Sequence, residues 1–140
     1  MNKRYNLIYW VATGLLAVGM VAQGVAQVVH TAGYAAIMTH LGYPLYFLTI
    51  IGTGKLLGTV AILLPGFQLL KEWAYAGFFF VMSGAATSHL ATGESVTAVL
   101  PSLVLLSLIV VSWQFRPADR KVSSLNPFQR DEQATVSTAA

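Results

Sequence analysis

A lysine lies near the middle of a stretch, residues 46–64, that is otherwise apolar enough to cross a lipid bilayer. Each Leu, Ile, Val or Phe of this stretch favours insertion by about 0.3–0.6 kcal/mol, whereas a central lysine costs about 2.5–3.5 kcal/mol. Lys55 lies about 13 Å from either end of the helix, and its side chain is too short to reach a membrane surface. We therefore expect its ammonium to face the interior of a helix bundle, where a partner or a polar cavity receives it.

The composition of the whole chain is that of an integral membrane protein. Of its 140 residues, 56% are hydrophobic and 9% are charged, which excludes an ordinary soluble domain. The chain has no cysteine, and this excludes a disulfide framework or a thiol relay carried by the chain itself. The formal charge of +3 is small and is explained by membrane topology, so nucleic acid is not expected as a partner.

Apolar stretches predict four transmembrane helices, at about residues 7–29, 46–64, 73–90 and 96–115. A cleaved signal peptide is the alternative for the first stretch, but the stretch is longer than a signal core and further spans follow it. A short interfacial helix, placed as a lid between the first two spans, is predicted by four side chains at helical spacing: Tyr34, Ile37, Met38 and Leu41. The predicted fold is therefore all-α, a transmembrane four-helix bundle over residues 1–116 with an interfacial helix between helices 1 and 2.

The basic residues predict the orientation of the bundle. Seven of the eight Lys and Arg residues fall on the side of the two termini: Lys3, Arg4, Lys71, Arg116, Arg120, Lys121 and Arg130. The opposite loops contain none, so both termini are expected in the cytoplasm, with the lid and Glu94 outside. Hydrophobicity falls after Arg116, and residues 117–140 are expected to form a disordered cytoplasmic tail.

Polar side chains gather in the outer half of the predicted bundle. The first span carries two glutamines and a histidine along one stripe, and the third carries a histidine near its outer end. The Lys55 side chain leans toward the N-terminus of its helix, which is also outward. We expect an outward-facing cavity floored by Lys55 and walled by Gln23, Gln27 and His89, with His30, His40 and Glu94 around its mouth.

Most of these residues have a structural alternative. Glutamines in membrane helices often join two helices by a hydrogen bond, interfacial histidines are often only wetted, and the GxxxG pair Gly54 and Gly58 is typical of helix packing. No metal or haem site is expected, because the histidines show neither HxxxH nor ExxH spacing and no cysteine accompanies them. Lys55 favours a function, since the cost of a buried ammonium is otherwise unexplained.

Two sequence runs carry a family resemblance, TIIGTGKLLGTVAILLPGF and KEWAYAGFFFVMSGAATSHLATGE. The most specific part is the run EWAYAG at 72–77, followed by Ser88, His89, Leu90 and Gly93. Over roughly residues 5–115 the chain resembles the DoxX-like family of small four-helix membrane proteins. The resemblance implies a protein of the bacterial inner membrane. Members of the wider group are linked to redox systems, including a thiosulfate to quinone oxidoreductase, and some handle thiols through cysteines that this chain lacks.

Three functions follow from these observations. The first is an accessory or binding subunit of an oxidoreductase system, whose cavity holds a quinone-like or small anionic molecule. Lys55 would supply positive charge, and His89 would exchange a proton. The second is a component of a small-molecule transporter or exporter, although no inverted repeat supports it. The third is a structural scaffold, a homo-oligomer in which Gly54 and Gly58 face another chain. Catalysis is left open, and no catalytic residue is assigned.

Overall fold

The structure, a computed structural model, describes residues 2–122, and all secondary structure in that range is helical. The elements are α1 (Lys3–Val28), α2 (Ala32–Leu41), α3 (Tyr46–Leu63), α4 (Gln68–Ala91), α5 (Val96–Gln114) and the 3-10 helix η1 (Ala118–Arg120). These elements confirm the predicted all-α class. The short α2 lies between the first two long helices, and the left-handed conformation of Gly42, with φ of 79°, ends it.

Three of the helices, α1, α3 and α5, are long and apolar enough to cross a membrane. The expected span at 73–90 lies within α4, which has 24 residues but does not belong to this set. This helix begins earlier than expected because the chain completes its turn at Gly66 and Phe67, which both have positive φ. The polar residues Gln68, Lys71 and Glu72 thus extend the helix beyond its apolar part.

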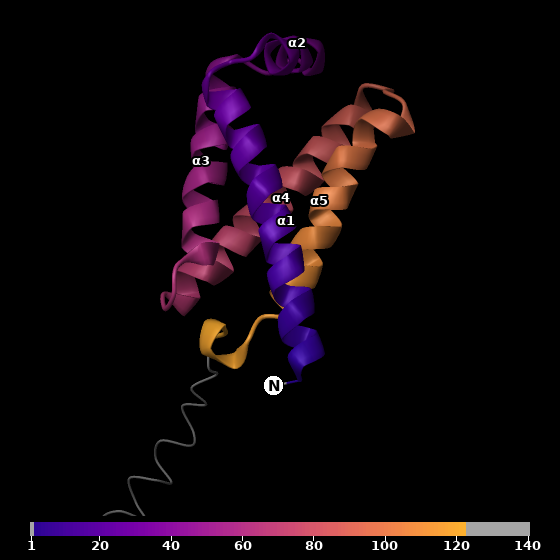
Figure 1. The fold of residues 1–140 in the computed structure, drawn as a ribbon. Coiled ribbons are helices and arrows are strands. Elements are labelled where there is room, and N and C mark those ends of the chain that lie inside the picture. Colours follow the sequence, from indigo (N-terminus) through magenta and orange to yellow (C-terminus); the bar gives the residue numbers. More distant parts are fainter. Residues whose placement is uncertain (1, 123–140) are drawn as a thin grey trace, which may run out of the picture.

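The long helices form two pairs. Helix α1 packs along α3, and α4 packs along α5, while α1 also meets α5 and α3 meets α4. Figure 1 shows the pairs converging toward the end that carries the N-terminus and parting toward α2 and the α4–α5 turn. The core lies where the pairs meet, and its buried side chains include Leu16, Met20, Ile62 and Phe78.

Close contacts at three glycines set this shape. A Cβ at Gly52 would lie 2.7 Å from the carbonyl oxygen of Gly24, so the backbones of α1 and α3 touch. The ring of Phe78 on α4 covers Gly58 on α3. In the same way Leu105 on α5 covers Gly19 on α1.

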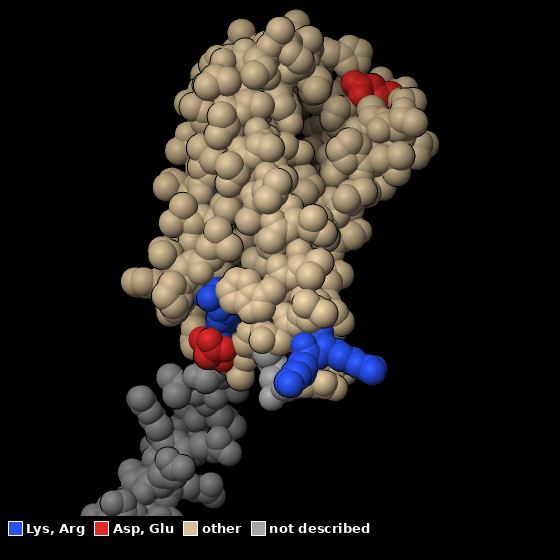
Figure 2. All heavy atoms as spheres, viewed as in Figure 1, with Lys and Arg blue, Asp and Glu red and all other residues tan. Residues whose placement is uncertain are grey.

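Basic side chains close the end of the bundle that carries the N-terminus. The Lys71 ammonium is buried, with 1% of the residue exposed, and it donates to the carbonyl oxygens of Ala61, at 2.8 Å, and Leu64. These carbonyls belong to the last turn of α3 and the residue after it, which have no partner within the helix. Figure 2 shows Lys and Arg side chains gathered at this end of the molecule.

The segment after α5 docks on the same end. Arg116 is paired with Glu72, with 2.6 Å between Nη2 and Oε1, and Arg120 donates to the carbonyl oxygen of Ile62 at 3.1 Å. The chain is therefore packed against the bundle past residue 116, where the tail was expected to begin. The rest of the expected tail, residues 123–140, lies outside the described residues.

Candidate functional site

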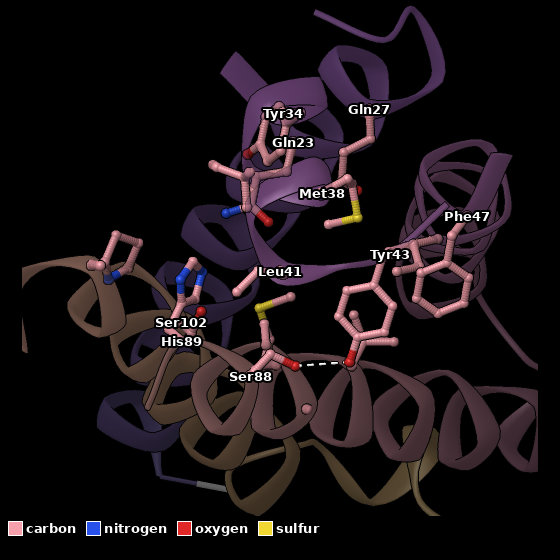
Figure 3. Close-up of a pocket in the computed structure, with 18 of the residues that line it drawn as sticks. Gln23, Gln27, Tyr34, Met38, Leu41, Tyr43, Phe47, Ser88, His89 and Ser102 are labelled. Atoms are coloured by element: carbon pink, nitrogen blue, oxygen red, sulfur yellow. Dashed lines mark hydrogen bonds between the residues drawn. The ribbon is translucent and has the colours of Figure 1, made fainter. Parts of the chain in front are cut away.

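A cavity of about 630 Å³ lies between the two helix pairs and beneath α2. All five α-helices contribute to its walls. Figure 2 shows the molecule hollowed near the end opposite the N-terminus. In Figure 3, Gln23 and Gln27 approach the cavity from one side and Ser88 and His89 from the other. Most of the remaining lining is apolar and includes Met38, Phe47, Ile51, Phe80 and Met82.

Lys55 is held at the cavity by the packing of α1 on α3. Only 3% of the residue is exposed, and its Nζ donates to Oε1 of Gln23 at 2.7 Å. Gly52 lies one turn before Lys55 and allows α1 to approach, which brings Gln23 within reach. The ammonium thus meets an amide oxygen beside a cavity, as expected. A lysine ammonium has three N–H donors, and among the described residues only this one hydrogen bond is made.

Glu94, in the turn between α4 and α5, joins two histidines. Its Oε2 accepts from Nδ1 of His89 at 2.6 Å, and its Oε1 lies 3.1 Å from Nε2 of His40. His89 and Glu94 line the cavity. Because Nδ1 of His89 is engaged, Nε2 is the ring nitrogen that a ligand can use, and a carboxylate-oriented imidazole of this kind can accept a proton.

Helix α2 forms a lid whose four apolar residues predicted from the spacing all line the cavity: Tyr34, Ile37, Met38 and Leu41. Burial raises the pKa of the Tyr34 phenol above its usual range. Two contacts tie the lid region to α4 and the turn after it. The Tyr43 hydroxyl is hydrogen-bonded to the Ser88 hydroxyl at 2.9 Å (Figure 3), and His40 contacts Glu94.

Releasing the lid should speed access to the cavity. The chain has no cysteine, so a single Ala85→Cys variant places one maleimide-reactive thiol in the cavity wall. Adding Glu94→Ala removes its contacts to His40 and His89, and we expect maleimide labelling about two- to fivefold faster, the effect of losing one partly exposed polar contact to the lid. Ser95→Ala is the control, since its hydroxyl is hydrogen-bonded to the nearby Thr97 at the start of α5 and to neither histidine. Equal labelling rates would show that Glu94 does not hold the lid.

The structure brings five of the six predicted ligand-binding residues to one cavity: Gln23, Gln27, Lys55, His89 and Glu94. It does not bring His30 there. Nε2 of this histidine is hydrogen-bonded to the Thr49 hydroxyl at 2.8 Å, and the side chain is exposed outside the cavity lining. His40 contacts Glu94 at the mouth without lining the cavity.

Sequence reasoning missed Ser102 and the pairing of Tyr43 with Ser88. Ser102 follows Pro101 on a helix that reads as apolar on all sides, and it is buried against the cavity. Ser88 directly precedes His89 in the sequence run that carries the family resemblance, and this position was the signal that could have identified it. Within residues 2–122, no group of three or more His, Cys, Asp or Glu side chains is arranged to hold a metal ion.

The fold and the cavity define a small, multi-pass helical membrane protein with a lidded, partly polar cavity. A family model described as the DoxX-like family matches residues 11–112, and the chain belongs to this family. The match confirms the resemblance seen in the two sequence runs. No curated protein and no solved structure matches the chain.

Proposed function

We propose that this DoxX-like protein holds a quinone-like or small anionic molecule in its cavity, as an accessory or binding subunit of a redox system. The proposal places it in the bacterial inner membrane as a four-helix bundle with both termini in the cytoplasm. Two features support this topology. Helix α4 packs against both α3 and α5, which are apolar enough to span, and basic side chains gather at the end that carries the N-terminus and the segment after α5.

The observation that carries the proposal is the placement of Lys55. Its ammonium is buried in a predicted membrane span, and the bond to Gln23 uses one of its three donors. Burying a charge in this way is costly and is found mostly at functional sites of membrane proteins. An anion or a carbonyl oxygen in the cavity would accept hydrogen bonds from the remaining N–H donors of Lys55. Binding of such a ligand would explain why the charge is buried despite its energetic cost.

The other lining residues fit the same kind of ligand. The amide nitrogen of Gln23 makes no hydrogen bond within residues 2–122, so its N–H groups remain available to donate to a ligand. His89, oriented by Glu94, is placed to exchange a proton with a bound molecule. The apolar side chains would enclose a ring or a chain. A quinone supplies electron transfer when it is bound, and these residues would position it and hold the proton.

The scaffold alternative loses part of its support. Its interface was expected at Gly54 and Gly58, but Gly58 is covered by Phe78 of the same chain. Gly54 has no atom within 4 Å of the position its Cβ would take, so of these two glycines it is the one open to a second copy. A single open glycine does not make a GxxxG interface.

Native mass spectrometry of the protein extracted with its own lipids tests the proposal. We expect an additional bound mass on the natural protein that disappears in Lys55→Met. Lys3→Met is the matched control, because Lys3 is exposed at the opposite end and should leave the bound mass in place. A natural protein without any bound molecule, or a mass that stays on Lys55→Met, would contradict the proposed function.

A further inference from the structure

The cavity has a polar side and an apolar side. In Figure 3, His89 and Ser102 lie on one side of the cavity, and Tyr43 and Phe47 lie on the other. On this second side α3 and α4 border the cavity with four residues that carry no polar side chain: Phe47, Ile51, Phe80 and Gly84. A ligand that fills the cavity therefore needs an apolar part as well as a polar part.

Two contacts between the α3 region and α4 close the apolar side at its ends. At the inner end the ring of Phe78 covers Gly58, and at the outer end the Tyr43 hydroxyl is hydrogen-bonded to the Ser88 hydroxyl at 2.9 Å. Phe78 and Ser88 are separated by about 15 Å of helix. Between them Phe80 lines the cavity and is 72% exposed. The cavity therefore opens to the surface between α3 and α4, and this opening is called the side window.

The side window faces lipid in the proposed topology. Phe80 lies near the middle of the predicted span at 73–90. The surface beside the window carries the exposed apolar side chains of Ile50 on α3 and Phe79 on α4. An ion does not enter hydrocarbon readily, because it would lose its hydration there. A molecule that uses the side window therefore comes from the lipid phase and is soluble in it.

The residues of α3 connect the side window to the buried ammonium. Phe47, Ile51 and Lys55 follow one another at intervals of four residues, which places them along one face of the helix. A carbonyl oxygen can accept a hydrogen bond from Lys55 while an attached chain runs past Ile51 to the window. A small anion would leave the apolar side of the cavity without a partner.

We propose that the cavity holds a lipid-soluble, quinone-like molecule whose carbonyl head faces Lys55 and whose apolar chain leaves the bundle through the side window. The inference rests on the proposed function and adds the chain and its route to it. It selects the quinone-like molecule over the small anion, and it makes the bilayer the source of the ligand.

Two probes with the same head test the place of the chain. Decylubiquinone carries a decyl chain, and 2,3-dimethoxy-5-methyl-1,4-benzoquinone has none. Binding is measured to the full chain in nanodiscs, with empty nanodiscs as the correction for partition into lipid. Gly84→Phe fills the side window, since no atom of the described residues lies within 4 Å of the position its Cβ would take. We expect it to bind decylubiquinone about tenfold more weakly, the effect of about two methylene groups losing their apolar contact. The chainless quinone should bind as it does to the natural protein.

Gly77→Phe is the matched control. Gly77 is an exposed residue of the same helix and also has no atom of the described residues within 4 Å of its Cβ position, but it does not line the cavity. This variant should bind both probes as the natural protein does. Each substitution replaces a helical glycine by a better helix former in open space, so both variants should melt no lower than the natural protein.

Photo-crosslinking locates the chain in the natural protein without a substitution. The probe is decylubiquinone with a diazirine in the middle of its chain, and the specific crosslinks are those that excess decylubiquinone suppresses. We expect them at the residues of α3 and α4 that border the side window. Specific crosslinks confined to α1, α2 or α5 would overturn the inference.

The outcomes separate the inference from the proposed function. Decylubiquinone that binds to Gly84→Phe as tightly as to the natural protein would overturn the inference. Equal weakening of both probes would also overturn it, because the substitution would then act on the head and not on the chain. If neither probe binds to the natural protein, the inference is wrong, and the mass bound to the extracted protein decides the proposed function independently. A small chainless molecule found there would overturn the inference and leave the proposed function intact.

Discussion

Replacing Lys55 with methionine and Gln23 with leucine together should give a bundle that is more stable than the natural one and unable to hold its ligand. The two side chains form a polar pair beside the cavity, in which Lys55 is buried and Gln23 is half-buried. Exchange of such pairs for apolar residues of similar size is often neutral or stabilises a fold by about 1–4 kcal/mol. We therefore expect a higher melting temperature. It can be measured by the fluorescence of the three native tryptophans.

The single variant Lys55→Met is the control for the double variant. Lys55→Met alone leaves Oε1 of Gln23 without its donor, which costs about 1–3 kcal/mol and offsets the gain. It should therefore melt below the double variant and lose the ligand as well. A double variant that melts lower than the natural protein would show that the pair holds the fold together. A double variant that is more stable and still binds would separate Lys55 from the function.

Gly52→Ala should lower the stability of the bundle more than any other glycine-to-alanine substitution. The added Cβ would lie 2.7 Å from the carbonyl oxygen of Gly24 and 3.0 Å from the amide nitrogen of Val28. Both are backbone atoms and cannot rotate away, so α1 and α3 must separate. Overpacking of this kind costs about 1–3 kcal/mol. Separation of the two helices also draws Gln23 away from Lys55, so ligand binding should fall together with the melting temperature.

Gly54→Ala is the matched control on the same helix. No atom lies within 4 Å of the position of its Cβ, and alanine is the better helix former, so the melting temperature should stay the same or rise slightly. If Gly52→Ala melts like Gly54→Ala, the close approach of α1 and α3 is not a feature of the protein. If Gly54→Ala is the damaging change, this face packs against another chain.

Much of the fold follows from the sequence, because long apolar stretches have few alternatives in a membrane. The bounds of α3 and α5 agree with the expected spans within a residue, and α2 presents the side chains that its spacing selects. The gathering of Gln23, Lys55 and His89 also followed from helix direction and depth, since these two quantities place each side chain along the bundle.

Other parts of the site depend on contacts that periodicity does not encode. Nothing in the sequence distinguishes Gly58, which receives the ring of Phe78, from Gly54, which receives nothing, because both lie in the same motif. His30 follows the stripe of Gln23 and Gln27, but α1 ends at Val28 and the histidine takes a positive φ of 50°, which turns it away. The burial of Lys71 arises from the unpaired carbonyls at the end of α3, which only the tertiary structure brings to it.

An experimental structure of the protein purified with its native lipids tests the central claim, that Lys55 is buried because it serves a ligand cavity. We expect a molecule between the helix pairs, with an oxygen in hydrogen-bond contact with Nζ of Lys55 while Gln23 keeps its bond to the same ammonium. Lys55 directed at acyl chains, or enclosed by leucines with neither an oxygen nor water nearby, would contradict the claim.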